Sequence, residues 1–280
     1  MDWTVWAGLV AGLLIAVVTA PVGVSGAVFL LPVHLSVFGV PNPAITPTNL
    51  LYNVVAGPGA LWRYRRDGTL RGPLTRRLIA GTLPGVVLGA AIRVYALPGP
   101  EVFQLLVAVL LLPLGLWLCA RTLAPAHRTP APARTRDSGE DRPLDLAVAP
   151  AEPRPAVLTA LAVGVGVFGG IYGIGGGSLL GPILAARGLP MSRVAPAALA
   201  ATFATSLVGA AAFVALSLAS SGDVAPDWWL GLACGLGGLV GGYLGARLQP
   251  RLPETALRLL LGVLAAAIGA FYAARSVGSL

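Results

Sequence analysis

Residues 169–182 read GGIYGIGGGSLLGP and interrupt an otherwise apolar run that extends from 157 to 188. Glycine and proline both weaken an α-helix, so a helix formed by this run must break here. The run is too long for one comfortable membrane span and too short for two. The stretch therefore predicts either a kinked helix or a re-entrant hairpin of two short helices within a membrane.

A weaker copy of this break lies 150 residues earlier in the chain. Residues 21–26 read PVGVSG within the apolar run 4–40, and the glycines at 23 and 26 align with those at 173 and 176. Further matches keep the same order, namely Pro32 with Pro182 and the four-residue glycine spacing of 81–89 with that of 237–245. Matches in register indicate an internal duplication, which is a common plan among transporters.

The composition places the whole chain in a membrane. Of its 280 residues, 56% are hydrophobic and only 11% are charged, which is too apolar for a soluble domain. A membrane span needs about 20 apolar residues, and eight runs approach or exceed that length: 4–40, 44–62, 74–97, 102–120, 157–188, 194–219, 227–248 and 254–274. We expect an all-α, polytopic integral membrane protein.

A polar segment at 121–155 separates two sets of four runs. It is rich in proline, arginine and acidic residues, a composition that does not form a buried core. We therefore predict a first membrane repeat at 1–120, a cytoplasmic linker at 121–155 and a second membrane repeat at 156–280.

The charges of the loops predict how the two repeats are oriented. The loop 63–77 carries six arginines against one aspartate, so the positive-inside rule places it in the cytoplasm. Its counterpart at 220–227 is acidic and is expected outside. The two repeats have opposite orientations only if each half crosses the membrane an odd number of times. If the first element of each half enters the membrane and returns to the same side, three crossings remain in that half. The expected architecture is two inverted four-element repeats, each opening with a glycine-broken or re-entrant helix pair.

Both breaks are candidate substrate-binding segments. A broken helix at membrane depth exposes backbone N–H groups that only protein or a water-filled pathway can satisfy. Short helices that begin near Ser25 and Ser178 would direct two positive helix ends at one point, which suits an anion. The candidate residues are Gly23, Ser25, Gly26, Gly173, Gly175, Gly176, Gly177 and Ser178. Glycines at 81–89 and 237–245 are assigned instead to close helix packing.

The apolar runs that follow the breaks supply neutral polar side chains. Asn49 and Asn53 are four residues apart and share a helix face, and so do Thr202 and Ser206. In the repeat register Thr202 aligns with Asn53. These side chains can hold a substrate without a fixed charge, or they can serve only as hydrogen-bonding contacts between helices.

The missing residue types narrow the function. All eleven acidic residues fall in loops or at the ends of runs, whereas a cation or drug pump usually buries a carboxylate. No Ser/His/Asp set or HExxH motif is present, so we expect no catalytic residues and no enzyme. Cys119 and Cys234 lack zinc-site spacing, so no metal and no cofactor are expected. The net charge of +8 comes from arginines in short loops, so no nucleic acid is expected as a partner.

The pattern GGGxxxxP at 175–182, followed by Gly188-Leu189-Pro190, resembles the TauE/SafE family, the sulfite exporter or toluene-sulfonate uptake permeases. The resemblance covers nearly the whole chain, including the first copy, where the motif is reduced to Val24-Ser25-Gly26 with Pro32. It implies a multi-pass protein of the bacterial inner membrane that moves sulfur-containing anions such as sulfite, thiosulfate or organosulfonates.

We therefore expect a secondary permease whose partners are a small anion and the lipid bilayer. Two alternatives stay open at this point. One is a permease for a neutral solute or a metal ion, and the other is a membrane assembly or interaction protein that moves nothing.

Overall fold

Each apolar run forms one helix or one broken pair of helices in the computed structural model, which describes residues 3–96, 100–123, 155–219 and 225–278. The first half contains α1 (Trp3–Thr19), the 3-10 turn η1 (Ala20–Val22), α2 (Ala27–Ser36), α3 (Asn42–Arg66), α4 (Pro73–Tyr95) and α5 (Pro100–Leu123). The second half contains α6 (Pro155–Tyr172), α7 (Leu180–Ala186), α8 (Met191–Ala219), α9 (Trp228–Leu248), η2 (Gln249–Arg251) and α10 (Glu254–Gly278). The described residues form no strand, and the predicted all-α class is confirmed.

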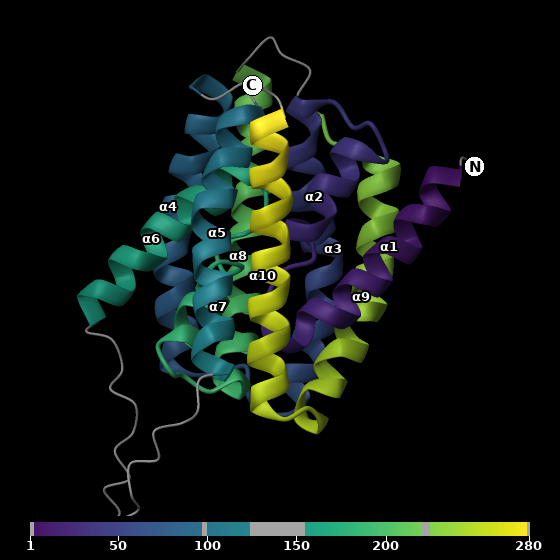
Figure 1. Cartoon of the computed structure of the whole chain (residues 1–280). Helices are drawn as coiled ribbons and strands as arrows, with labels where there is room; N and C mark the ends of the chain where they lie inside the picture. The colour runs from purple at the N-terminus through teal and green to yellow at the C-terminus, as the bar shows by residue number, and fades with distance from the viewer. Residues whose placement is uncertain (1–2, 97–99, 124–154, 220–224, 279–280) are drawn as a thin grey trace, which may run out of the picture.

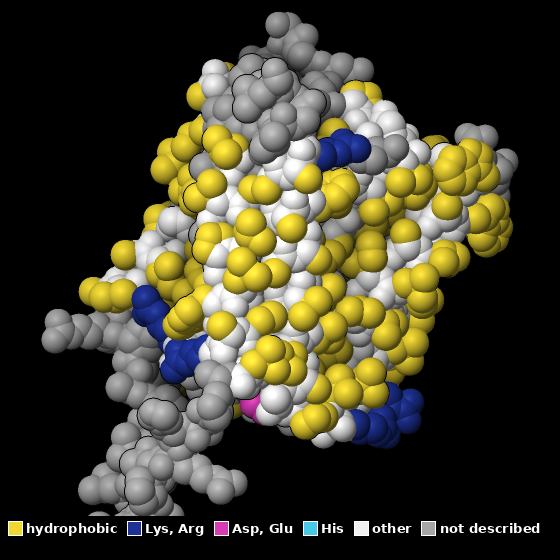
Figure 2. Space-filling model, in the orientation of Figure 1, with side chains coloured by type: hydrophobic (Ala, Val, Ile, Leu, Met, Phe, Trp, Pro, Cys, Tyr) yellow, Lys and Arg dark blue, Asp and Glu magenta, His cyan; other side chains and the backbone are white. Residues whose placement is uncertain are grey.

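The helices carry the apolar surface that a bilayer requires. Five of them are long and apolar enough to cross a membrane: Trp3–Val22, Pro73–Tyr95, Met191–Leu216, Trp228–Arg251 and Glu254–Arg275. Figure 2 shows apolar side chains across the middle of the visible face, with arginines toward its ends. Lipid accepts such side chains without cost, so the predicted polytopic membrane protein is confirmed.

Helices of the two halves pack on one another reciprocally. Helix α1 packs on α9, and its counterpart α6 packs on α4. Helix α5 packs on α10, and α3 lies against both α8 and α9. Figure 1 shows α1 descending from the upper right and α6 rising from the lower left, so these two helices run in opposite directions. An inverted repeat requires this arrangement; the duplication itself stays a prediction.

The first run forms a hairpin. The ring of Trp3, at the start of α1, lies 6.2 Å from the ring of Phe38, just beyond α2. The chain therefore returns to the end of the bundle at which it entered (Figure 1). At the two breaks Gly23 and Gly173 have φ values of 73° and 68°, a conformation that glycine adopts without steric cost. Helices α2 and α7 begin two residues after the predicted starts.

The glycines spaced by four in α4 and α9 allow close helix contacts, as predicted. A Cβ atom at Gly85 would lie 2.3 Å from the carbonyl oxygen of Val163 in α6. One at Gly241 would lie 2.2 Å from the carbonyl oxygen of Leu13 in α1. A side chain at either position would force the paired helices apart, so the packing role is confirmed.

The described helices reach slightly into the segment assigned to the linker. Helix α5 ends at Leu123 and α6 begins at Pro155. Residues 124–154 of the predicted linker and 220–224 of the predicted external loop lie outside the described residues.

Candidate functional site

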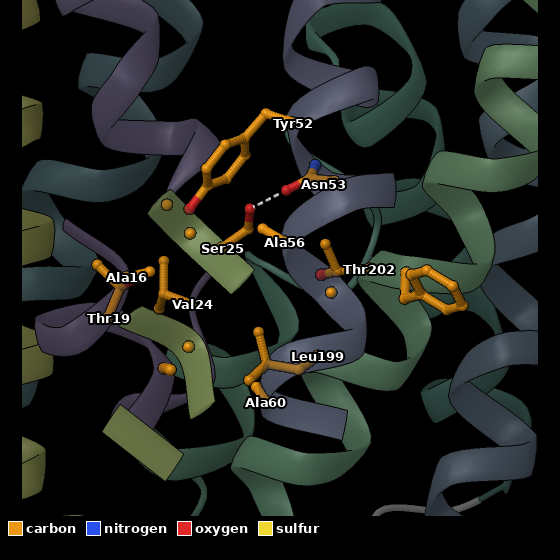
Figure 3. A pocket seen from close by; sticks show the side chains of 16 residues that line it. Ala16, Thr19, Val24, Ser25, Tyr52, Asn53, Ala56, Ala60, Leu199 and Thr202 are labelled. Atoms are coloured by element: carbon orange, nitrogen blue, oxygen red, sulfur yellow. Dashed lines mark hydrogen bonds between the residues drawn. The ribbon is translucent and has the colours of Figure 1, made fainter. Parts of the chain in front are cut away.

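A small cavity lies beside the break between η1 and α2. It has a volume of about 40 Å³, which accommodates a few water molecules or a small ion. Polar side chains from α1, the break, α3 and α8 line it, namely Thr19, Ser25, Tyr52, Asn53 and Thr202 (Figure 3). No charged side chain is among its lining residues. Within the described ranges, no three His, Cys, Asp or Glu residues are placed to hold a metal ion.

The side chain of Asn53 ties the two breaks together. The hydroxyl of Ser25 donates a hydrogen bond to Oδ1 of Asn53. The Nδ2 group of Asn53 donates to the carbonyl oxygen of Gly173 at 3.3 Å. Both bonds are buried, so this asparagine on α3 holds the first break and the second break against the same helix.

Unused backbone donors lie at the start of α2. The N–H group of Ala27 donates to Oγ of Ser25 at 3.1 Å, and that of Phe29 donates to the carbonyl oxygen of Gly26 at 3.0 Å. The N–H groups of Ser25 and Gly26 donate to no other residue in the part of the chain that the structure describes. Helix N-termini carry such free donors together with partial positive charge, and here they border the cavity.

The second break is packed closed. A Cβ atom at Gly177 would lie 1.8 Å from the carbonyl oxygen of Ala198, and one at Gly173 would lie 2.3 Å from that of Thr46. The N–H group of Gly176 donates to Oγ1 of Thr205 at 2.9 Å. The glycines therefore let this segment lie directly on the backbones of α3 and α8, and no space is left beside them for a ligand.

Thr202 belongs to both regions. Its side chain lines the cavity at the first break, and its Oγ1 lies 3.4 Å from Oγ of Ser178. Ser178 in turn donates to the carbonyl oxygen of Ile174 at 2.6 Å, inside its own break. The absent side chain of Gly175 leaves room for Thr202, since a Cβ atom there would lie 2.5 Å from Cγ2 of Thr202.

Asn49 and Ser206 lie apart from the cavity. Both are fully buried, and neither is among the lining residues. The amide of Asn49 lies near the ring of His34, yet neither its nitrogen nor its oxygen makes a hydrogen bond of normal geometry within the described chain. The Oγ of Ser206 is likewise unpaired among those residues. Buried polar groups of this kind are normally satisfied by water or a ligand.

The structure thus divides the predicted site residues into groups. Ser25, Gly26, Asn53 and Thr202 meet at the cavity, whereas Gly173 to Ser178 form the packed second break. Gly23 is packed as well, since a Cβ atom there would lie 2.5 Å from Cα of Ala195.

Sequence reasoning missed three residues that hold the breaks in place. Thr205 accepts from Gly176, Tyr64 donates to the carbonyl oxygen of Ala20, and Gln249 donates to that of Pro21. Thr205 follows Thr202 by three residues, which places both on one helix face, and this spacing could have indicated Thr205. Tyr64 and Gln249 stand next to arginine-rich loops, and no pattern there indicates a buried polar contact.

Comparison with known proteins relates nearly the whole chain to membrane transport. The family model described as "Sulfite exporter TauE/SafE" matches residues 8–272. The chain is also similar to "Probable membrane transporter protein YunE" of Bacillus subtilis (strain 168). The two are 26% identical over 271 residues, which cover 93% of this chain and 94% of the relative. No solved structure matches the chain.

Proposed function

From the finding that the chain belongs to the sulfite exporter TauE/SafE family of membrane transporters, we propose that it is a secondary permease for a small anion. Its apolar spans and its similarity to a membrane transporter make it a multi-pass protein of the cell membrane. The proposed cargo is a sulfur-containing anion, namely sulfite, thiosulfate or an organosulfonate, in line with the family description.

The observation that carries the proposal is the uncharged cavity at the first break. Its polar groups are hydroxyls, an amide and main-chain N–H donors, and no carboxylate lines it. A carboxylate at this depth would favour a cation or a proton and would repel an anion. Donors without a fixed charge, placed at the start of a helix, favour an anion.

The proposed binding mode replaces water around the anion with protein donors. Removing an anion from water is costly unless hydrogen bonds compensate for the loss. The N–H groups of Ser25 and Gly26 and the hydroxyl of Thr202 supply such bonds, and the hydroxyl of Ser25 can rotate from Asn53 toward the anion. Partial charges bind more weakly than a buried arginine, which permits release as well as capture.

The remaining predicted residues take supporting roles in this proposal. Gly23, Gly173, Gly175, Gly176, Gly177 and Ser178 fix the two breaks against α3 and α8. Asn49 precedes Asn53 by one turn of α3, and Ser206 follows Thr202 by one turn of α8. We assign the unpaired side-chain groups of Asn49 and Ser206 to positions along the path of the anion, because a passing anion would accept hydrogen bonds from them.

The test is uptake into proteoliposomes containing the purified full-length protein. Labelled sulfite, thiosulfate and an organosulfonate are compared with glycerol and a divalent metal ion, with empty vesicles as the baseline. We expect flux of at least one of the anions and none of glycerol or the metal. Flux of glycerol or metal alone would favour the neutral-solute or metal permease, and no flux of any solute would overturn the transport proposal.

A further inference from the structure

A second and larger cavity lies at the end of the bundle that carries the arginine-rich loop. Its volume is about 600 Å³, and it is lined by residues of the loop between α3 and α4 and of the segment that leads into α8. Arg71 and Arg193 are exposed on its wall. We call it the vestibule. Its positive charge raises the local concentration of anions.

A small buried cluster borders the cavity at the first break. The cluster consists of Ala20, Ala60, Tyr64, Ala195 and Ala246, with Leu70 and Leu199 packed against it. Ala60 and Leu199 also line the break cavity, and Figure 3 places both at the end away from Tyr52. On the other side, Leu70 belongs to the loop that lines the vestibule. The cluster therefore joins the wall of the break cavity to the loop that lines the vestibule.

The turn η1 is held in this cluster by Tyr64. The hydroxyl of Tyr64 donates to the carbonyl oxygen of Ala20 at 3.1 Å, and the side chain is only 2% exposed. The carbonyl oxygen of Tyr64 accepts from the N–H group of Thr69 at 3.1 Å. This tyrosine thus links the break directly to the loop at the vestibule.

Gln249 holds η1 from the opposite side. Its Nε2 group donates to the carbonyl oxygen of Pro21 at 2.7 Å and to that of Met191 at 3.2 Å. Gln249 is only 7% exposed, although it begins the turn η2, which ends at the exposed Arg251. A buried amide that makes two such bonds fixes the position of both backbones, here η1 and the first residue of α8.

We propose that Tyr64 and Gln249 are the latches of a gate between the break cavity and the vestibule, and that η1 is the moving part. The turn is three residues long and is followed by Gly23, and glycine has the widest range of backbone conformations of any residue. When both latches release, η1 leaves the cluster and the cavity opens to the vestibule. Tyr64 and Gln249 are positioning residues, and the gate rests on the proposed transport function.

The test measures access to the cavity by a reagent that is not transported. Ala56→Cys introduces one thiol at the cavity wall in a Cys119→Ser/Cys234→Ala background, and a membrane-impermeant thiol reagent is applied from the vestibule side. Loss of one hydrogen bond changes an equilibrium about fivefold. We therefore expect Tyr64→Phe to speed modification about fivefold, Gln249→Ala, which removes two bonds, to speed it by more, and the double variant to exceed either. Tyr95→Phe is the matched control, because Tyr95 is 67% exposed at the end of α4 and belongs neither to the cluster nor to the lining of either cavity.

The outcomes separate the gate from the transported substrate. If the melting temperatures show folded protein and the thiol in neither latch variant is modified faster than in the Tyr95→Phe control, the gate is wrong even when anion flux is normal. If the thiol is modified faster in the latch variants and no anion is transported, the gate is supported and the proposed cargo is wrong.

Discussion

The two breaks align in sequence but differ in what surrounds them. The second break has the richer glycine motif, and its glycines at 173 and 177 lie against the backbones of α3 and α8 with no space between. The first break has only a reduced motif, yet it borders a cavity and keeps two unused N–H donors among the described residues. Dense glycine here therefore indicates close packing, and the break that borders a cavity is the one with Ser25 in place of a glycine.

The physical reason lies in one pair of aligned positions. Gly175 has no side chain, so Thr202 fills the space beside it. Ser25 stands at the equivalent place in the first break, and its hydroxyl reaches Asn53. The Ser25 hydroxyl lines the cavity, whereas the space beside Gly175 is filled by Thr202. We infer that the second break is a scaffold and the first break is the site.

The largest expected effect comes from filling the second break. Gly177→Ala adds a methyl group 1.8 Å from the carbonyl oxygen of Ala198, and backbone cannot yield as a side chain does. Overpacking of this kind costs about 1–3 kcal/mol or more, so we expect a lower melting temperature and little monodisperse protein. Gly164→Ala is the control, because nothing lies within 4 Å of a Cβ atom there. Equal melting temperatures for the two variants would show that the second break is not tightly packed.

Gly176→Leu should abolish transport in protein that still inserts. A Cβ atom at Gly176 would lie 2.9 Å from Cβ of Thr82, so a leucine pushes α4 away from the break and disturbs the bond to Thr205. Flux per inserted molecule is the measurement, with Gly164→Leu as the control. Normal transport by correctly inserted Gly176→Leu would show that transport does not depend on the packed geometry of the second break.

Asn53→Ala should weaken transport less than Gly176→Leu does. It removes the group that joins Ser25 to Gly173, and one lost buried partner costs about 1–3 kcal/mol. We expect the apparent affinity for the anion to fall by about fivefold or more. Thr205→Val serves as the comparison, since of the two breaks its hydroxyl bonds only to the second, and it should lower the melting temperature while leaving the affinity unchanged. If Thr205→Val lowered the affinity and Asn53→Ala lowered only the melting temperature, the second break would be the binding site and the first break the scaffold.

The smallest effect is expected outside both breaks. Arg65 is exposed in the last turn of α3, within the arginine-rich segment 63–77, and lines neither cavity. Arg65→Gln should reduce the amount of inserted protein and leave the apparent affinity within about twofold, because screened surface charges contribute little to a buried site. A large loss of affinity in correctly inserted protein would place the loop in the binding step.

The sequence alone was sufficient for the elements and insufficient for the site. Apolar run lengths and the helix breakers at 21–26 and 169–178 predicted the membrane helices and the two broken pairs. These features act locally, through helix propensity and the thickness of a bilayer. Which break borders a cavity depends on contacts such as that of Gly177 with Ala198 and that of Ser25 with Asn53, and a single sequence does not reveal such pairs.

The latch residues Tyr64 and Gln249 could not be predicted from the sequence for the same reason. Gln249 and Pro21 are 228 residues apart in the chain, and Tyr64 and Ala20 are 44 apart. Neither pair follows a helical or repeat spacing, so only the packed fold brings the donors to the carbonyl oxygens of η1.

The most direct test of the central claim compares the serine of each break in one assay. Ser25→Ala and Ser178→Ala each remove a single hydroxyl, and sulfite uptake as a function of concentration gives the apparent affinity. Because Ser25 faces the cavity and Ser178 bonds within its own break, Ser25→Ala should weaken the affinity about fivefold. Ser178→Ala should lower the melting temperature and leave the affinity unchanged. An equal or larger loss of affinity in Ser178→Ala would contradict the assignment of the first break as the site.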